Sequence, residues 1–255
     1  MKNIVAIIPA RMGSTRFPGK PLEKICGMPM IGHVWHRAKM SNRLSDVYVV
    51  TYDQEIKDYV ESIGGKAIVA KGRYERCPDC TAEALETIEK ETGKKVDIVV
   101  MIQGDEPMLI PETIDAALKP IEEDPTVNVV NLYTDLKTKE EHEDPNEPKV
   151  VVNPKGDEAV YFSREPIPSR KLYVGDVAAY KQVCIIPFRR DTLLQFRDME
   201  RTPLEIIEAI DMLRFIENGM KVHMVYQDID TYAVDTPKDL EKVESILSKE
   251  KLSYL

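Results

Sequence analysis

A basic loop directly after an apolar N-terminal run contains the residues best suited to bind an anion. It spans Pro9–Pro21 and reads Pro-Ala-Arg-Met-Gly-Ser-Thr-Arg-Phe-Pro-Gly-Lys-Pro. Arg11, Arg16 and Lys20 supply three cations, and two glycines allow the backbone to approach a ligand closely. Backbone N–H groups combined with three cations are suited to a triphosphate. A basic surface turn is the alternative interpretation.

This loop matches neither of the two common phosphate-binding motifs. Its Gly19-Lys20 pair is followed by Pro21, where a Walker A motif requires serine or threonine. The glycine spacing of a dinucleotide-binding fingerprint is also absent. The loop does follow the first predicted strand, however, and open α/β sheets bind their ligands at the carboxyl ends of strands.

An acidic motif follows a second buried strand. Gln103-Gly104-Asp105-Glu106-Pro107 comes directly after the apolar run that ends at Ile102. Carboxylates in this position commonly bind Mg²⁺ beside nucleotide phosphates. Asp235, in Ala-Val-Asp-Thr-Pro, is a candidate partner carboxylate, and a helix N-cap is the alternative role for it. Together the two segments predict a magnesium site.

Strands and helices that alternate through the first half of the chain must position these residues. Such alternation predicts a mainly parallel, doubly wound, Rossmann-like sheet with helices on both faces. The predicted strands are Ile4–Pro9, Asp46–Thr51, Lys66–Ala70 and Asp97–Ile102, and the predicted helices are Pro29–Lys39, Gln54–Ile63 and Thr81–Glu91.

The second half of the chain has a less regular pattern. Strands are predicted at Val127–Tyr133, Val150–Asn153, Ala159–Phe162, Val183–Pro187 and Val222–Tyr226. An apolar stripe predicts one helix over Pro203–Asn218, and a final helix begins at Pro237. The stripe consists of Leu204, Ile207, Ile210, Leu213 and Ile216. We therefore expect one α/β nucleotide-binding domain over residues 1–255, with a smaller β-rich lobe at about 127–190.

The composition excludes several classes of protein. The formal net charge of −9, from 35 basic and 44 acidic residues, argues against general binding to nucleic acid or to a membrane surface. No apolar run approaches the roughly 20 residues that span a bilayer, and the N-terminus lacks the pattern of a secretory signal. Four cysteines without a regular framework predict a reduced, cytoplasmic protein.

Five motifs in order give the chain a family resemblance. They are the basic loop, Gln103–Pro107, Tyr161-Phe162-Ser163-Arg164, Thr202-Pro203-Leu204-Glu205 and Val234-Asp235-Thr236-Pro237. Over about Ile4 to Leu240 the sequence resembles the 3-deoxy-manno-octulosonate (Kdo) cytidylyltransferases. The resemblance implies a nucleotidyltransferase fold, a homodimer, and transfer of CMP from CTP to an acidic sugar, with release of pyrophosphate. The product would be an activated CMP-sugar for cell-surface polysaccharide, either lipopolysaccharide or capsule.

The resemblance also implies roles for particular residues. Arg11 and Lys20 would act on the reacting triphosphate, with Mg²⁺ bound by Asp105 and Asp235. Gln103 would lie near the cytidine. The full set of implied nucleotide-binding residues is Pro9, Ala10, Arg11, Ser14, Arg16, Lys20 and Gln103.

The implied acceptor site departs from the family pattern. Gln182 and Met212 stand where the family has histidine and glutamine, and the glycine and arginine of another motif are missing from Tyr74–Glu83. Because a changed hydrogen-bonding inventory changes substrate choice, the acceptor is open: Kdo, another 2-keto sugar acid, a phosphonate or a polyol phosphate. A nucleotide other than CTP, and a non-catalytic nucleotide-binding protein, are further alternatives. The predicted acceptor-binding residues are Arg164, Gln182, Glu208 and Asp211.

Two alternatives concern single features of the sequence. Cys77 and Cys80 could form half of a zinc site or a redox pair, and a simple role lining the nucleotide or substrate pocket is favoured because no second cysteine pair exists. Arg164 could bind the acceptor carboxylate as a bidentate fork, or could be an ordinary arginine at the end of a surface strand.

Overall fold

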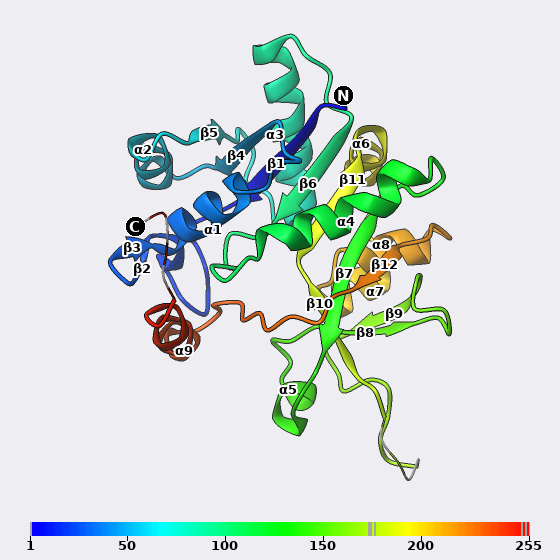
Figure 1. The fold of residues 1–255 in the computed structure, drawn as a ribbon. Helices are drawn as coiled ribbons and strands as arrows, with labels where there is room; N and C mark the ends of the chain where they lie inside the picture. Colours follow the sequence, from blue (N-terminus) through cyan, green and yellow to red (C-terminus); the bar gives the residue numbers. More distant parts are fainter. Residues whose placement is uncertain (1, 173–174, 176, 251, 253, 255) are drawn as a thin grey trace. The chain divides into compact units, whose positions relative to one another are not determined.

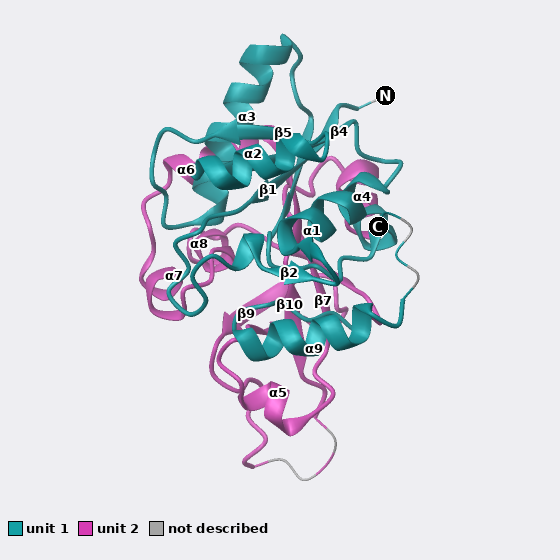
Figure 2. Cartoon of the chain, turned by 90° about the vertical axis from the view of Figure 1, so that its left-hand side faces the viewer, with its two compact units in different colours: residues 1–115, 230–255 teal, residues 116–229 magenta. Residues whose placement is uncertain are grey.

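The structure, a computed structural model, describes residues 2–172, 175, 177–250, 252 and 254. The chain forms two compact units, one of residues 1–115 and 230–255 and the other of residues 116–229 (Figure 2). The β-rich lobe predicted at about 127–190 falls within the second unit, whose bounds are wider. In the described ranges, no helix is long and apolar enough to cross a membrane.

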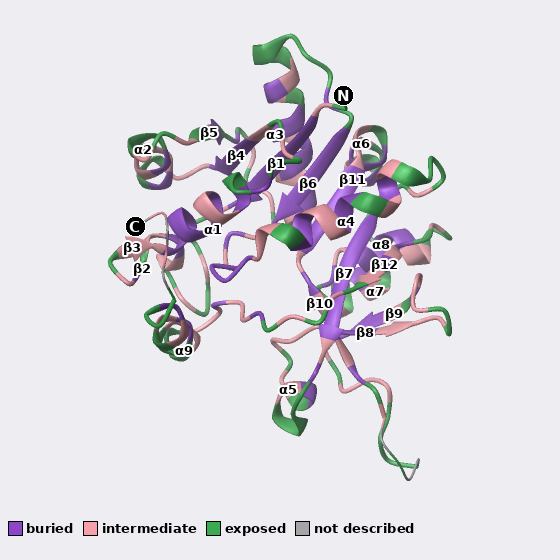
Figure 3. Ribbon diagram, in the orientation of Figure 1, coloured by how far each residue is buried: buried purple, intermediate pink, exposed green. Residues whose placement is uncertain are grey.

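A parallel sheet forms the centre of the first unit (Figure 1). Its strands run in the order β6 (Ile98–Ile102), β1 (Ile4–Pro9), β4 (Asp46–Thr51) and β5 (Lys66–Val69), and all three pairs are parallel. The side chains of β1 and β6 are buried along their whole length (Figure 3). Such continuous apolar runs belong to strands covered on both faces. The predicted mainly parallel α/β fold is confirmed.

Three α-helices lie between these strands in sequence, and α9 (Pro237–Leu247) follows near the C-terminus of the first unit. The three are α1 (Met30–Lys39), α2 (Gln54–Ser62) and α3 (Cys77–Thr92), and the unit also contains a short 3₁₀ helix η1 (Lys20–Leu22) and a small hairpin of β2 (Lys24–Ile25) and β3 (Met28–Pro29). The prediction placed the start of α3 at Thr81, which is wrong by four residues. Pro78 occupies the first turn, a position that proline favours. Cys77 and Cys80 therefore lie in the first helical turn rather than in a loop. A further helix, α4 (Pro111–Glu123), was not predicted, and the boundary between the two units falls inside it.

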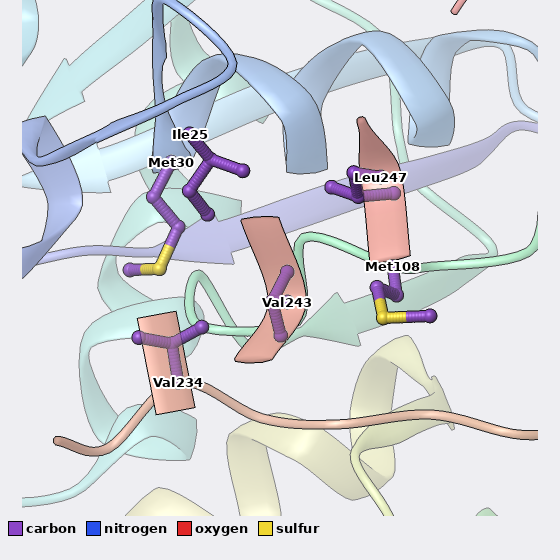
Figure 4. Close-up of a cluster of buried hydrophobic side chains, with 6 residues drawn as sticks. All are labelled: Ile25, Met30, Met108, Val234, Val243 and Leu247. Atoms are coloured by element: carbon purple, nitrogen blue, oxygen red, sulfur yellow. The ribbon is translucent and has the colours of Figure 1, made fainter. Parts of the chain in front are cut away.

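A small apolar cluster in the first unit fixes the segment that follows residue 230. Val234 is fully buried there beside Met30, Met108 and Val243, and the cluster also contains Ile25 and Leu247 (Figure 4). Burial of these side chains, at about 25 cal/mol per Å² of apolar surface, attaches α9 and the residues before it. The cluster therefore holds the backbone next to Asp235 in place.

A second sheet organises the second unit. Its strands run in the order β12 (His223–Tyr226), β7 (Val130–Asp135), β10 (Tyr180–Val183), β8 (Lys149–Val152) and β9 (Ala159–Ser163). Among the described pairs of this sheet, β12–β7 is parallel and the others are antiparallel. The strand predicted over Val183–Pro187 is in fact the end of β10 and most of β11 (Ile185–Arg189), separated at Cys184. Helices α5 (Lys139–Glu143), α6 (Arg190–Asp198), α7 (Pro203–Glu208) and α8 (Met212–Glu217) complete the unit.

The predicted helix over Pro203–Asn218 is two helices, and its predicted apolar stripe is partly wrong. The chain breaks at Ala209, whose φ is +54°. Glu205 of α7 is fully buried because it forms a bidentate ion pair with Arg214 of α8 (Nε–Oε2 2.7 Å, Nη2–Oε1 2.6 Å), while Ile207 is 74% exposed. The turn between the helices allows this buried pair, and periodicity alone gives no sign of it.

Candidate active site

A cavity in the first unit opens at the carboxyl ends of β1, β4 and β6. This is the edge at which open α/β sheets bind ligands. All nine residues predicted to bind the nucleotide or the metal contribute to its lining. They are Pro9, Ala10, Arg11, Ser14, Arg16, Lys20, Gln103, Asp105 and Asp235.

Lys20 lies at the centre of an ion network at this cavity. Its ammonium donates to Asp105 Oδ2 (2.7 Å), to the Val234 carbonyl (2.9 Å) and to Asp235 Oδ1 (3.1 Å). Arg16 Nη2 also donates to Asp235 Oδ1, at 2.7 Å. Burial acts to lower the pKa of Lys20, but the charges and hydrogen bonds of the two carboxylates outweigh it, and the pKa is raised. The network thus combines two cations with two carboxylates and keeps Lys20 charged.

Two segments 130 positions apart are brought together to form this network. The backbone N–H of Val234 donates to the Asp105 carbonyl at 2.9 Å. The alternative role considered for Asp235, helix N-cap, is wrong, because Thr236 caps α9 in a capping box with Asp239. The Asp235 carboxylate consequently faces Lys20 and Arg16 instead of the end of the helix.

Glycine at position 104 is required by close packing rather than by a bend. A Cβ at this position would lie 2.7 Å from the Pro9 carbonyl oxygen and 3.5 Å from Cβ of Ala10. The end of β6 therefore passes the end of β1 at a distance that only glycine permits. In the basic loop, Gly19 does need its conformational freedom, since its φ is +80°.

One wall of the cavity was not predicted from the sequence. Tyr52, Tyr74, Glu75 and Arg76 contribute to the lining, as do Cys77 and Cys80. Arg11 Nη1 donates to the Tyr74 carbonyl at 3.4 Å. The sequence did carry a signal for these residues, because Tyr52 directly follows β4 and the others lie between β5 and α3, at the ligand-binding edge. Both cysteines line this cavity, as expected, and their place beside a nucleotide or substrate stays a prediction.

The glutamate at position 83 anchors this wall from the second turn of α3. Its carboxylate accepts from the backbone N–H groups of Lys71 (2.8 Å) and Gly72 (3.5 Å), and from the side chain of Tyr74. Burial acts to raise the pKa of Glu83, but these hydrogen bonds lower it. Cys80 has the opposite balance, because burial raises the pKa of its thiol to about 12. That thiol is therefore protonated at neutral pH.

The four predicted acceptor-binding residues belong to the second unit. Arg164 and Glu208 are in contact, since the Arg164 N–H donates to Glu208 Oε2 (2.8 Å) and its Nε to the Glu208 carbonyl (2.8 Å). The Arg164 guanidinium also donates to the Pro145 carbonyl at 2.7 Å. In this structure it therefore binds the backbone carbonyl at the end of α7 and a carbonyl in the loop after α5. Asp211 stands before the first residue of α8 and is half-buried.

Gln182 is not brought together with Glu208. Glu208 accepts hydrogen bonds from Tyr161 (3.1 Å) and Ser163 (2.8 Å) on β9. In the sheet register Ser163 pairs with Lys149, which pairs with Lys181, so Ser163 and Lys181 share one face. Gln182 follows Lys181 and points to the opposite face, where its amide donates to Asn131 Oδ1.

The described part of the chain holds no group of three or more His, Cys, Asp or Glu side chains arranged for a metal ion. All four cysteines are free thiols. A protein-only zinc site at Cys77 and Cys80 therefore receives no support from the described residues. A site formed by the carboxylate pair, in which a bound phosphate supplies further oxygens, is compatible with this geometry.

Comparison with known proteins points to one family. The sequence profile of the cytidylyltransferase family matches residues 5–222. The 3-deoxy-manno-octulosonate cytidylyltransferase of Geobacter metallireducens is 38% identical over 256 residues, which cover 96% of this chain and 98% of that protein. The enzyme of the same name from Geotalea uraniireducens is 40% identical, with 96% and 99% coverage.

Solved structures agree with these sequence relatives. The structure of a CMP:2-keto-3-deoxy-manno-octonic acid synthetase complexed with CTP is similar with a TM-score of 0.87 and 34% identity, covering 97% of this chain and 99% of that one. A 4-diphosphocytidyl-2C-methyl-D-erythritol synthase from Anaerococcus prevotii has a TM-score of 0.64 and 16% identity, with 97% coverage of both chains. The second similarity concerns the fold alone.

Proposed function

The chain belongs to the cytidylyltransferase family of CTP-dependent nucleotidyltransferases, and we propose that it transfers CMP from CTP to 3-deoxy-manno-octulosonate. Pyrophosphate is the second product, and the CMP-sugar serves the synthesis of cell-surface polysaccharide. The observation that carries the proposal is the network of Arg16, Lys20, Asp105 and Asp235 at the edge of the cavity. The names of the relatives support the choice of substrates.

The network is balanced before substrate binds and can be redistributed by a triphosphate. Lys20 and Arg16 bind the two carboxylates in this structure, so their charges are compensated. A nucleoside triphosphate brings several negative charges to the cavity, which draw both cations toward the phosphate oxygens. Arg11, in the lining of the same cavity, adds a third cation. The triphosphate is thereby neutralised and oriented by groups on a single loop.

We propose that Mg²⁺ binds at Asp105 and Asp235 when the nucleotide is present. The carboxylate pair fits the preference of this cation for oxygen ligands. Asp105 Oδ1 is buried and, in the described part of the chain, makes no hydrogen bond, which is costly for a carboxylate oxygen unless a cation binds it. A bound magnesium ion would neutralise phosphate charge and lower the pKa of an attacking hydroxyl.

The reaction is a displacement at the α-phosphorus of CTP. An oxygen of the acceptor forms the new P–O bond while the bond to the bridging oxygen of the β-phosphate breaks, and the electron pair leaves with pyrophosphate. Arg11, Arg16 and Lys20 stabilise negative charge on the phosphoryl oxygens and the leaving group. Gln103, in the lining of the same cavity, orients the nucleoside. No covalent enzyme intermediate is required, because positioning and charge stabilisation suffice.

We further propose a homodimer located in the cytoplasm. Support for the dimer is the family membership, and support for the location is the supply of CTP inside the cell together with the four free thiols. Size-exclusion chromatography coupled to light scattering tests the dimer, and a mass of about one chain would contradict it. Fractionation of the native host tests the location.

Pyrophosphate release by the purified protein tests the proposed reaction. CTP, UTP, ATP and GTP are each combined with Kdo, other 2-keto sugar acids and small phosphonates, with and without Mg²⁺. Turnover that requires CTP, Kdo and Mg²⁺ is expected. Turnover with another acid alone would overturn the choice of acceptor, and CTP binding without any turnover would favour a non-catalytic protein.

A matched pair of variants tests the carboxylate site. Asp235→Asn removes a charge from the network and should lower kcat by at least about 100-fold, because donor or charge losses at such sites are worth that much. Asp58→Asn is the control, since Asp58 is an exposed carboxylate on α2 of the same unit. An equal rate for the two variants would contradict the assignment.

A further inference from the structure

The backbone of a single residue, Met12, organises the basic loop. The carbonyl oxygen of Met12 accepts hydrogen bonds from the backbone N–H groups of Ser14 and Gly19, both at 2.9 Å. The N–H of Met12 donates to the Asp53 carboxylate at 2.7 Å. Met12 directly follows Arg11, and Gly19 directly precedes Lys20. The hydrogen bond from Gly19 to Met12 therefore links the two ends of the loop that carry Arg11 and Lys20.

The contact between Asp53 and Met12 joins two separate segments of the first unit. The residues are 41 positions apart in sequence, and the pair connects the loop after β1 with the loop after β4. Asp53 follows Tyr52, which lines the cavity, but Asp53 is not itself among the lining residues. The Asp53 carboxylate therefore binds the backbone of the loop and does not line the cavity.

Asp53 does not cap its own helix, although its position at the start of α2 is the one that a capping aspartate normally occupies. It is the N-cap residue of α2, yet its side chain accepts no hydrogen bond from the start of the helix. An aspartate at this position usually caps the first turn and contributes about 1 kcal/mol. Thr236 at the start of α9 does cap its helix. The Asp53 carboxylate is thus directed to the loop rather than to its own helix.

We propose that Asp53 is a positioning residue for CTP binding, and this inference rests on the proposed function. By accepting the Met12 N–H, Asp53 fixes the backbone that positions Arg11, Ser14 and Lys20 toward the phosphates. A charge-assisted hydrogen bond of 2.7 Å is among the stronger backbone contacts. Without this hydrogen bond the loop samples other conformations. Ordering the loop on CTP binding then has a cost in free energy, which weakens the binding.

The variants Asp53→Ala and Asp53→Asn separate positioning from charge. Alanine removes the acceptor, whereas asparagine keeps an oxygen that can accept from the Met12 N–H. We expect Asp53→Ala to bind CTP roughly tenfold or more weakly, as hydrogen bonds to charged groups imply, and to raise KM for CTP while KM for the acceptor is unchanged. Asp53→Asn should restore affinity to within about threefold.

Titration calorimetry with CTP in the absence of acceptor is the main measurement. Inorganic tripolyphosphate is a second probe, which reports the anion affinity of the loop without the base or the acceptor. Glu61→Ala on α2 is the control for a change in that helix, because among the described contacts the Glu61 carboxylate binds only Lys57 of the same helix. Thermal unfolding of all four proteins detects a general loss of stability.

The outcomes distinguish this inference from the proposed function. Weaker binding of either probe by Asp53→Ala, with rescue by Asp53→Asn and no change for Glu61→Ala, supports the positioning role. Equal affinity of Asp53→Ala and wild type for both probes overturns the positioning role. An equal rise of KM for both substrates, together with lower thermal stability in both Asp53 variants, also overturns it. Failure of wild type to turn over Kdo overturns the proposed function and leaves the binding comparison intact.

Discussion

Replacement of Lys20 by methionine has the largest effect that the site geometry predicts. Methionine has a similar length but no charge, so the change removes three hydrogen bonds, to Asp105, Asp235 and the Val234 carbonyl. Two carboxylates then lose their shared cation, and Asp235 retains its contact with Arg16. The change therefore acts on binding, on chemistry and on stability at once.

The expected magnitudes differ for these three effects. Loss of one charged donor from the reacting phosphates should lower kcat by about 100- to 1000-fold. The free energy of unfolding should fall by about 2 kcal/mol at pH 7, because a hydrogen bond to a charged group contributes about 1.5–3 kcal/mol and the partial exposure of the carboxylates reduces this value. The stabilising contact in wild type exists below the ordinary pKa of lysine and is lost as pH rises through the raised pKa of Lys20.

Pyrophosphate release and urea unfolding measure these effects on the same preparation. Unfolding is followed at pH 7 and at increasing alkaline pH, where loss of the Lys20 charge should reduce the difference between Lys20→Met and wild type. Arg43→Met, a change at an exposed cation outside the cavity lining, is the control. A rate within threefold of wild type would refute the assignment of Lys20 to the triphosphate, and equal stability at pH 7 would refute the ion network.

Three further predictions concern packing, the buried ion pair and a thiol. Gly104→Ala should lower kcat/KM for CTP at least tenfold in the pyrophosphate assay, because its Cβ would lie 2.7 Å from the Pro9 carbonyl oxygen and displace the end of β1; wild-type kinetics would contradict this. Arg214→Met should destabilise the protein by about 3 kcal/mol in urea, since it removes the buried bidentate partner of Glu205 and leaves the longer contact with Arg201 at 3.5 Å. Burial acts to raise the pKa of Glu205, but Arg214 lowers it. In wild type the stability from this pair is therefore present above the ordinary glutamate pKa and is lost as pH falls through the lowered value. If the difference in unfolding free energy between wild type and Arg214→Met stayed constant from pH 7 to pH 3, the pair would be contradicted. The Cys80 thiol, with its pKa raised to about 12, should resist iodoacetamide at pH 8 over a time that labels a free thiol in solution, as mass spectrometry of the intact protein can show.

Much of the nucleotide site could be predicted because parallel strands impose a simple geometry. Their carboxyl ends meet at one edge of the sheet, so a basic loop after the first strand and Asp105 after another are adjacent whatever the loops between them do. Asp235 is predicted as the partner carboxylate from the Ala-Val-Asp-Thr-Pro segment, and the family motif agrees with this role. Its backbone is placed by the apolar cluster around Val234, which joins residues from four separate segments and has no local pattern.

The parts that could not be predicted depend on side-chain contacts between distant residues. Periodicity assigns Ile207 to the core, but the structure exposes it, whereas Glu205 outside the stripe is fully buried because it pairs with Arg214. Asp53 has the same character, since its position predicts a helix cap and its contact is with Met12. The position of a charged side chain depends on its partner, and sequence spacing does not identify a partner 41 positions away.

The sheet register of the second unit changes how the acceptor residues should be interpreted. Gln182 is assigned to the acceptor site by family resemblance and Glu208 by its place beside the apolar stripe, but Gln182 points to the face of the sheet opposite to Ser163, and Ser163 binds Glu208. A small acid cannot contact both faces of a sheet at once without the strands between them being rearranged. Gln182 therefore bears first on the contact with Asn131, and we propose Glu208 with its hydroxyl neighbours Tyr161 and Ser163 as the place to test for acceptor binding.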